Sequence, residues 1–357
     1  MPKASPPSKT MIAFLLLAVL LAAAGSAVVK ALPRPATAPA ATAETAPPEE
    51  EPKGAALAAS AEEKSGTQKG GRRKKKVYTL ILAGLDETSG NTDTIVLARL
   101  DASAHRMDFV SIPRDTYVNL PWDVRKINCV YTASKNVGES GLEGLRDAVC
   151  ALCGFRPDCC AVVGISTVRE AIDLMGGVYF DVPFDMDYED AAQDLRIHIP
   201  AGYQCLNGEQ CVQLCRYRKN YVNGDLDRIA VQHDFLRAAA KQFISLGSIP
   251  ELPGVVQLAA RSIDSDMSAA NIAFFLRCAI QCKPENIRFA TVPNVPAEAG
   301  GLCYTFIEKD EWLALLNEAI NPFDAPIREE NLDIVYRRDG RYYATSGHIR
   351  GADYLRH

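Results

Sequence analysis

An apolar run near the N-terminus, Met11–Val29, constrains the architecture of this chain more than any other feature. The run contains no charged residue, and its length approaches the roughly 20 residues that cross a bilayer as a helix. It predicts a single-pass membrane anchor that follows a short cytoplasmic tail, residues 1–10. Small residues at 22–26 also suit a signal peptidase, so a cleaved signal peptide is the alternative. Under both interpretations we expect a protein of the cell membrane or envelope whose main domain is extracytoplasmic.

The next segment, residues 30–76, is predicted to be a disordered linker. Residues 31–71 are rich in Ala, Pro, Glu and Thr and contain no aromatic residue, Ile or Val. Such a segment cannot bury enough apolar surface to offset the entropy lost on folding. The linker ends in a basic run, Arg72–Lys76, which we interpret as solvated; contact with anionic lipid headgroups is the alternative.

The overall charge argues against nucleic-acid binding. The net charge is −5 and the sequence pI is about 5.7, even with the basic run included. No domain-wide positive field is therefore available to attract a polyanion such as DNA.

Eleven cysteines are many for a protein that is expected outside the cytoplasm. Cys150, Cys153, Cys159 and Cys160 lie close together in the sequence, which predicts at least one disulfide among them. A zinc site is the rival interpretation. It is disfavoured because no histidine lies near the group and two of the cysteines are adjacent.

Strand and helix patterns predict the fold of residues 77–323. Three apolar, β-rich runs come first, which suggests neighbouring strands in one sheet. The predicted strands are 77–85, 94–100, 106–112, 160–165, 178–182 and 287–292, and the predicted helices are 138–153, 168–175, 207–217, 227–246 and 310–320, with a mostly helical stretch from 247 to 282. This order favours an α/β fold, a three-layer α/β/α domain with a mixed central sheet covered by helices.

The remaining residues, 324–357, form a short polar extension. Asp339-Gly340 suits a tight turn between two short β-rich runs, 334–338 and 342–345. The sequence therefore predicts a β-hairpin in this extension, and its pattern assigns no function to it.

Arginines and aspartates at predicted strand ends and loops suggest an anion site. Arg216 and Arg218 lie two residues apart at the end of a helical pattern, so their guanidinium groups can converge on one anion. Guanidinium binds two oxygens in a planar fork, which matches phosphate. A structural network of Asp–Arg pairs is the alternative, since single surface arginines are usually only solvated or paired.

Two aspartates follow and precede neighbouring strands at one edge of the predicted sheet. Asp86 comes after the first strand and Asp93 comes before the second. Carboxylate oxygens beside a phosphate are the environment that Mg²⁺ requires, because this ion binds one or two carboxylates together with phosphate oxygens and water. The pattern is therefore compatible with a magnesium site at that edge.

Six short sequence segments together indicate a family resemblance. They are NTDTIVLARL, VSIPRDTYV, KIN, DLMGGVYFDVP, IPAGYQCLNGEQCVQLCRYRK and GDLDRIAVQ, in this order. Together they resemble the LytR-CpsA-Psr family over residues 77–323. Several segments in family order are far more specific than any one motif.

The resemblance implies an α/β/α catalytic domain with an apolar cleft for a polyprenyl chain and a pyrophosphate site at the mouth of the cleft. It implies catalytic roles for Arg114, Arg216, Arg218, Asp225 and Arg228, substrate binding by Lys126 and Gln232, and Mg²⁺ binding by Asp86 and Asp93. The sequence departs from the family pattern at Asn91 and Val231, where the family often has Arg. Loss of these charges weakens phosphate contact.

The resemblance also implies an activity. We expect a phosphotransferase that moves a glycopolymer, such as teichoic acid or capsule, from a polyprenyl pyrophosphate carrier to a sugar hydroxyl of peptidoglycan. Charge stabilisation and positioning would dominate such a reaction. The alternatives are a polyprenyl pyrophosphate phosphatase, in which water attacks, and a non-catalytic lipid-binding or regulatory protein of the envelope.

Overall fold

The computed structural model describes residues 71–86, 89–190, 195–217 and 286–350, together with single residues and short stretches between 219 and 282. The predicted anchor, Met11–Val29, and the linker up to residue 70 lie outside the described residues. Within the described part of the chain, no helix combines the length and apolarity needed to cross a membrane.

A six-stranded mixed sheet forms the centre of the molecule. Its strand order is β10-β3-β2-β1-β4-β9, with β1–β2, β2–β3 and β4–β9 antiparallel and β1–β4 and β10–β3 parallel. The strands are β1 (Val77–Asp86), β2 (Asn91–Asp101), β3 (Arg106–Ile112), β4 (Cys159–Gly164), β9 (Ile263–Ser265) and β10 (Ile287–Thr291). Five of them match predicted strands. The exception is β9, because its three residues lie in the stretch that was predicted to be mostly helical.

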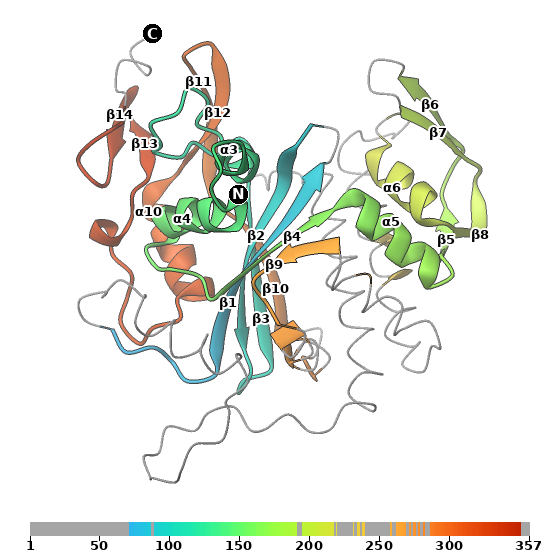
Figure 1. Ribbon diagram of the computed structural model, residues 1–357, viewed down its shortest axis with the longest axis horizontal. Coiled ribbons are helices and arrows are strands. Elements are labelled where there is room, and N and C mark those ends of the chain that lie inside the picture. Colours follow the sequence, from blue (N-terminus) through green and yellow to red (C-terminus); the bar gives the residue numbers. More distant parts are fainter. Residues whose placement is uncertain are drawn as a thin grey trace.

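Helices lie on both sides of this sheet (Figure 1). On one side are α3 (Val130–Asn136), α4 (Gly141–Cys153) and α10 (Lys309–Leu315). Helix α10 continues into a π-helical turn at Leu316–Ile320. On the other side are α5 (Ile165–Leu174) and α6 (Gly208–Arg216). Every residue of β4 and all of β2 from Thr94 to Leu100 are buried, as expected for strands that are covered on both faces. The predicted α/β architecture is confirmed.

Local capping explains two of the helix boundaries. The Ser140 side chain accepts a hydrogen bond from the Glu143 N–H at 3.3 Å, so α4 begins after this serine rather than at Gly138 as predicted. Asn207 and Gln210 form a reciprocal capping box at the start of α6, which satisfies two N–H groups that a helix start otherwise leaves unpaired.

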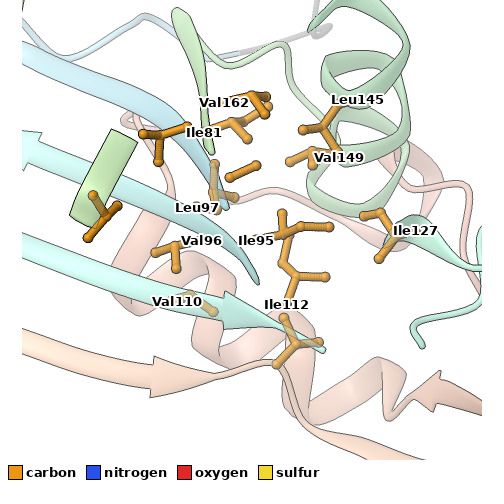
Figure 2. Packing of buried hydrophobic residues seen from close by; sticks show 14 of the residues in the cluster. Ile81, Ile95, Val96, Leu97, Val110, Ile112, Ile127, Leu145, Val149 and Val162 are labelled. Carbon is orange, nitrogen blue, oxygen red and sulfur yellow. The ribbon is translucent and has the colours of Figure 1, made fainter. Parts of the chain in front are cut away.

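The main core joins the sheet to its helices. Figure 2 shows Ile81 of β1 and Val162 of β4 beside Leu145 and Val149 of α4, and all four side chains are at most 2% exposed. Ile127 lies near Ile95 and Ile112 in the same view. This packing holds the ends of β1, β2 and β3 in fixed positions relative to one another.

Four further hairpins and pairs surround the sheet. They are β5 (Val178–Val182) with β8 (Gly202–Leu206), β6 (Met186–Asp190) with β7 (Leu195–Ile199), β11 (Asn294–Ala299) with β12 (Leu302–Ile307), and β13 (Val335–Arg338) with β14 (Arg341–Ala344). The predicted C-terminal hairpin is confirmed: Asp339 and Gly340 have φ of 50° and 76°, the left-handed values that a two-residue hairpin turn requires.

The basic run at 72–76 is part of the folded domain. The Lys74 N–H donates to the Pro322 carbonyl at 2.8 Å, and Arg73 pairs with Phe323 in an isolated β-bridge. The Arg73 guanidinium also forms an ion pair with Asp158. The interpretation of this run as a purely solvated linker end is therefore wrong for Arg73 and Lys74.

The predicted disulfide is absent, and all eleven cysteines are free thiols. Successive residues of a strand point to opposite faces of a sheet. Accordingly Cys160 belongs to the main core together with Cys153, whereas Cys159 packs with Leu80 and Ala98 in a separate cluster. The Cys153 thiol instead donates to the Phe155 carbonyl at 3.1 Å.

Candidate functional site

The candidate site lies at the end of the sheet where β1 ends, β2 begins and the chain leaves β3. Asp86 is the last residue of β1 and stands opposite Asn91, the first residue of β2. Gly84 pairs with Thr94 and Leu85 pairs with Thr92, so Asp93 is an extra residue in β2. A bulge of this kind redirects a side chain away from the regular alternation of the strand. The bulge thereby places Asp93 at this end of the sheet, beside the segment that follows β3.

Arg114 follows β3 and lies between two carboxylates. Its Nη1 donates to Asp93 Oδ2 at 3.0 Å, and its Nε lies 3.5 Å from Asp115 Oδ2. The Nζ of Lys126 lies 2.7 Å from the other oxygen of Asp115. We call Asp93, Arg114, Asp115 and Lys126 the charged row, because their charges alternate in sign. The Arg114 side chain remains 52% exposed, so part of its guanidinium can bind an anion from solvent.

Backbone hydrogen bonds fix the position of the charged row. The Asn128 N–H donates to the Arg114 carbonyl at 3.2 Å, and the Ile127 N–H donates to the Thr116 carbonyl at 3.0 Å. The Thr92 hydroxyl donates to the Asn128 carbonyl at 3.0 Å. The segment after β3, the segment with Lys126 and the start of β2 therefore form one rigid unit.

An aromatic residue completes the support on one side. The Nζ of Lys126 lies 5.6 Å from the centre of the Tyr304 ring, within the range of a cation–π interaction. Tyr304 belongs to β12 and is 1% exposed. The sequence pattern did not indicate this contact, because it joins residues that are far apart in the chain.

Two further side chains, Thr94 and Cys129, lie close to the charged row. Thr94 is 2% exposed, and its hydroxyl has no hydrogen-bond partner in the described part of the chain. Cys129 lies near Lys126, Asp115 and Asp93, and burial raises the pKa of its thiol. A thiol with a raised pKa is a poor nucleophile at neutral pH, so covalent catalysis by Cys129 is disfavoured.

The structure places only some of the predicted site residues together. Asp93, Arg114 and Lys126 meet in the charged row, and Asp86 lies at the adjacent strand end. Arg216 is the last residue of α6, is half-buried, and forms no ion pair with any residue that the structure describes. The predicted residues Arg218, Asp225, Arg228 and Gln232 lie outside the described residues.

The carboxylate groups of Asp86 and Asp93 are the type of ligand that binds Mg²⁺. Both are carboxylates at neighbouring strand ends, and Mg²⁺ is typically held by one or two carboxylates while phosphate oxygens and water fill its remaining positions. No group of three or more His, Cys, Asp or Glu side chains with metal-site geometry occurs among the described residues.

Comparisons with known proteins place this geometry in a family. The sequence model of the LytR_cpsA_psr family matches residues 48–321. The cell wall biosynthesis protein LcpA of Corynebacterium glutamicum is 29% identical over 240 residues, 60% of this chain and 45% of that protein. The polyisoprenyl-teichoic acid–peptidoglycan teichoic acid transferase TagV of Bacillus subtilis is 27% identical over 200 residues, 53% of this chain and 50% of that protein. The chain thus spans about half the length of these relatives.

A solved structure supports the fold. The crystal structure of protein gbs0355 from Streptococcus agalactiae superposes with a TM-score of 0.55 and 19% sequence identity, and the match covers 70% of this chain and 90% of that one. At this identity the likeness concerns the fold alone.

Proposed function

Because the chain belongs to the LytR_cpsA_psr family, we propose that it is a phosphotransferase that moves a glycopolymer from a polyprenyl pyrophosphate carrier to a sugar hydroxyl of peptidoglycan. Arg114 carries this proposal. Its guanidinium is held by Asp93 and Asp115, yet about half of its side chain stays exposed at the end of the sheet. The relative TagV, a polyisoprenyl-teichoic acid–peptidoglycan teichoic acid transferase, supports the same kind of donor and acceptor.

In the proposed reaction, an acceptor hydroxyl attacks the phosphorus that bears the glycan. A new P–O bond forms to the acceptor oxygen, and the bond from that phosphorus to the bridging oxygen breaks, so that polyprenyl phosphate leaves. Negative charge spreads over the phosphate oxygens in such a transfer. Arg114 is positioned to stabilise that charge, and Lys126 adds a second positive charge near it. The hydroxyl proton would pass to a carboxylate, for which Asp93 and Asp225 are the candidates.

We also propose that Asp86 and Asp93 hold Mg²⁺ together with the pyrophosphate. The ion would supply positive charge against the phosphate oxygens. Arg216, Arg218 and Arg228 remain proposed pyrophosphate ligands, and Gln232 a proposed substrate-binding residue. Removal of divalent ions by a chelator should abolish turnover, and added Mg²⁺ should restore it.

The proposed acceptor requires an extracytoplasmic domain held at the membrane. We therefore retain Met11–Val29 as the proposed anchor, with residues 1–10 on the cytoplasmic side. Protease added to wall-stripped intact cells should digest the domain from Val77 onward. Protection of the domain until the membrane is broken would contradict both this topology and the proposed acceptor.

The test of the reaction class is acceptor dependence. Purified full-length protein is incubated with a synthetic polyprenyl pyrophosphate glycan and Mg²⁺, with and without peptidoglycan oligomers, and the products are weighed by mass spectrometry. We expect a glycan–phosphate–peptidoglycan product only when the oligomers are present. Equal release of glycan phosphate without oligomers would favour the phosphatase alternative, and no turnover in either sample would favour a non-catalytic role.

A further inference from the structure

The C-terminal hairpin β13–β14 has one face inside the domain and one face in solvent. On the inner face, Val335 is 1% exposed and the Tyr342 ring packs 4.8 Å from the ring of Phe306. The Tyr342 hydroxyl also donates to the Glu298 carbonyl at 3.1 Å. These contacts fix the hairpin rigidly against β11 and β12, beside which it lies in Figure 1.

The outer face combines two aromatic rings with two arginines. Tyr336 is directly opposite Tyr343, and Arg338 is directly opposite Arg341. Paired residues and residues two apart share one face of a hairpin, so all four side chains lie on the outer face. The two tyrosine rings are stacked with centres 5.8 Å apart at 26°, and Tyr343 is 40% exposed.

The arginine pair is not explained by the stability of the hairpin. Like charges directly opposite each other on paired strands are destabilising. Arg338 has one distant partner, Asp310 at 3.7 Å, and its side chain is 60% exposed. Arg341 forms no ion pair with any residue in the described part of the chain. An external anion between the two guanidinium groups would relieve this repulsion.

A hollow of about 590 Å³ lies beside the hairpin. Its polar lining combines Lys309, Arg337 and Arg338 with the carboxylates Glu308, Asp310 and Glu311. The Nζ of Lys309 lies 5.1 Å from the centre of the Tyr336 ring. The carboxylates of this hollow disfavour an anionic ligand, so the proposed binding surface is the exposed face of the hairpin itself.

Strand β12 connects the hairpin to the charged row. The Thr305 N–H donates to the Asp115 carbonyl and the Tyr117 N–H donates to the Thr305 carbonyl, both at 2.9 Å. The two residues adjacent to Thr305 belong to one aromatic cluster. Tyr304 contacts Lys126, and Phe306 contacts Tyr342. The hairpin is thus attached to the charged row through one packed cluster of the same folded unit.

We propose that the outer face of β13–β14 is an accessory binding site for an anionic sugar–phosphate polymer. The exposed ring of Tyr343, stacked on Tyr336, offers a flat surface to the C–H face of a sugar ring, and the two arginine forks bind phosphate oxygens. The positive pair suits a polyanion although the whole chain carries a net charge of −5. This inference rests on the proposed function for the identity of the polymer, which is the glycan part of the donor.

The test uses a soluble probe that cannot react. Glucosylated poly(glycerol phosphate), without lipid or pyrophosphate, is titrated onto full-length protein in detergent, and binding is measured by calorimetry at low and high salt. We expect Arg338→Gln/Arg341→Gln to weaken binding about five- to thirtyfold at low salt and to reduce the salt dependence. Lys75→Gln/Lys76→Gln removes the same charge from another exposed position and should leave binding unchanged.

Several outcomes would overturn the inference. Binding that is equal in wild type and the hairpin variant, or equally reduced in the Lys75/Lys76 control, would show no specific site on the hairpin. Stronger binding to phosphatidylglycerol vesicles than to the polymer would make this face a membrane contact. Transfer activity is assayed separately: normal transfer with no polymer binding would reject only this inference, whereas specific polymer binding without transfer would support it and reject the proposed function.

Discussion

Arg114 and Asp108 show how differently charged residues are used within β3 and the segment that follows it. Asp108 is 1% exposed, and its carboxylate accepts hydrogen bonds from Arg99, Arg106 and Arg288 at 2.8 to 3.4 Å. Such a buried, saturated carboxylate is structural. Arg114 has carboxylate partners too, but 52% of its side chain faces solvent. This difference in exposure is the residue-scale reason to place anion binding at Arg114.

We predict that Arg114→Lys lowers the transfer rate about a hundredfold or more while leaving the fold intact. Lysine keeps the charge but loses the planar fork that can bind Asp93 and a phosphate oxygen together. Because the arginine is half exposed, we expect the free energy of unfolding to change by less than about 1 kcal/mol. Transfer rate at saturating Mg²⁺ and thermal melting are measured side by side. Arg328→Lys, at a side chain that is 70% exposed, is the control, and near-normal transfer by the Arg114 variant would remove this residue from the site.

Two neighbouring buried threonines allow a matched test of the local hydrogen bonding. The Thr92 hydroxyl is bonded to the Asn128 carbonyl, whereas the Thr94 hydroxyl has no partner among the described residues. Thr92→Val should lower the free energy of unfolding by about 1–3 kcal/mol, because it leaves a buried carbonyl unpaired. Thr94→Val should be neutral or stabilising. Urea unfolding measures both, and an equal loss in the two variants would mean that Thr94 has a hydrogen-bond partner.

At the scale of elements, the sequence predicted the strands with a clear apolar, β-rich or turn pattern and missed the strands without one. The runs that became β1, β3 and β5 are apolar and β-rich, so their pattern is clear. In contrast, β11 reads NVPAEA and β6 reads MDYED, and Pro, Ala, Glu and Asp are depleted in strands. These strands form because they pair with partners and pack on the domain, which no local pattern reveals.

The candidate site, like the strands, was only partly predictable from the sequence. The motif residues Asp93, Arg114 and Lys126 lie together in the structure, and their roles stay predictions. The support that Tyr304 gives to Lys126 depends on β12, a strand that the sequence did not indicate. Arg216, Arg218, Asp225, Arg228 and Gln232 stay predictions, since the structure describes only the first of these residues and shows it without an ion pair to a described residue.

We predict that Asp108→Asn destabilises the sheet without a direct effect on the reaction. Asp108 joins Arg99 of β2 and Arg288 of β10 to β3, and the Arg99 side chain is 10% exposed. Loss of the carboxylate charge leaves the Arg99 guanidinium with Asp101, 3.2 Å away, as its remaining carboxylate partner, and we expect a cost of about 1–3 kcal/mol. Urea unfolding measures the loss, and Asp310→Asn, at a side chain that is 73% exposed, should change stability by less than about 1 kcal/mol. Equal stability of the two variants would contradict this account of the sheet.

At the scale of the whole molecule, both ends of the described chain belong to the domain. Arg73 and Lys74 bind the segment at Pro322–Phe323, and the Asn119 amide donates to Asp333 at 2.7 Å. The extension after residue 323 therefore forms part of the same folded unit as the charged row. The folded unit begins before Val77 and includes the hairpin, so shorter versions of the protein that end near residue 323 should lose stability.

Cysteine reactivity tests the packing of the whole molecule. Cys205 and Cys303 are exposed, whereas burial raises the pKa of Cys159 and of Cys160 to about 12. Since the thiolate is the reactive form, iodoacetamide at pH 8 should label Cys205 and Cys303 and spare Cys159 and Cys160. Peptide mapping measures the labelling. In denaturant without reductant all eleven cysteines should react, and a pair that resists would reveal a disulfide instead of free thiols.

The fate of a single phosphorus atom tests the central claim most directly. A donor is made with ³²P only in the phosphate that bears the glycan, and it is incubated with the full-length protein, Mg²⁺ and insoluble peptidoglycan. We predict that the label becomes bound to the washed peptidoglycan in a phosphodiester, in proportion to the polyprenyl phosphate released, and that Arg114→Lys lowers both products together. Label recovered only as soluble glycan phosphate would contradict transfer to the wall and establish hydrolysis in its place.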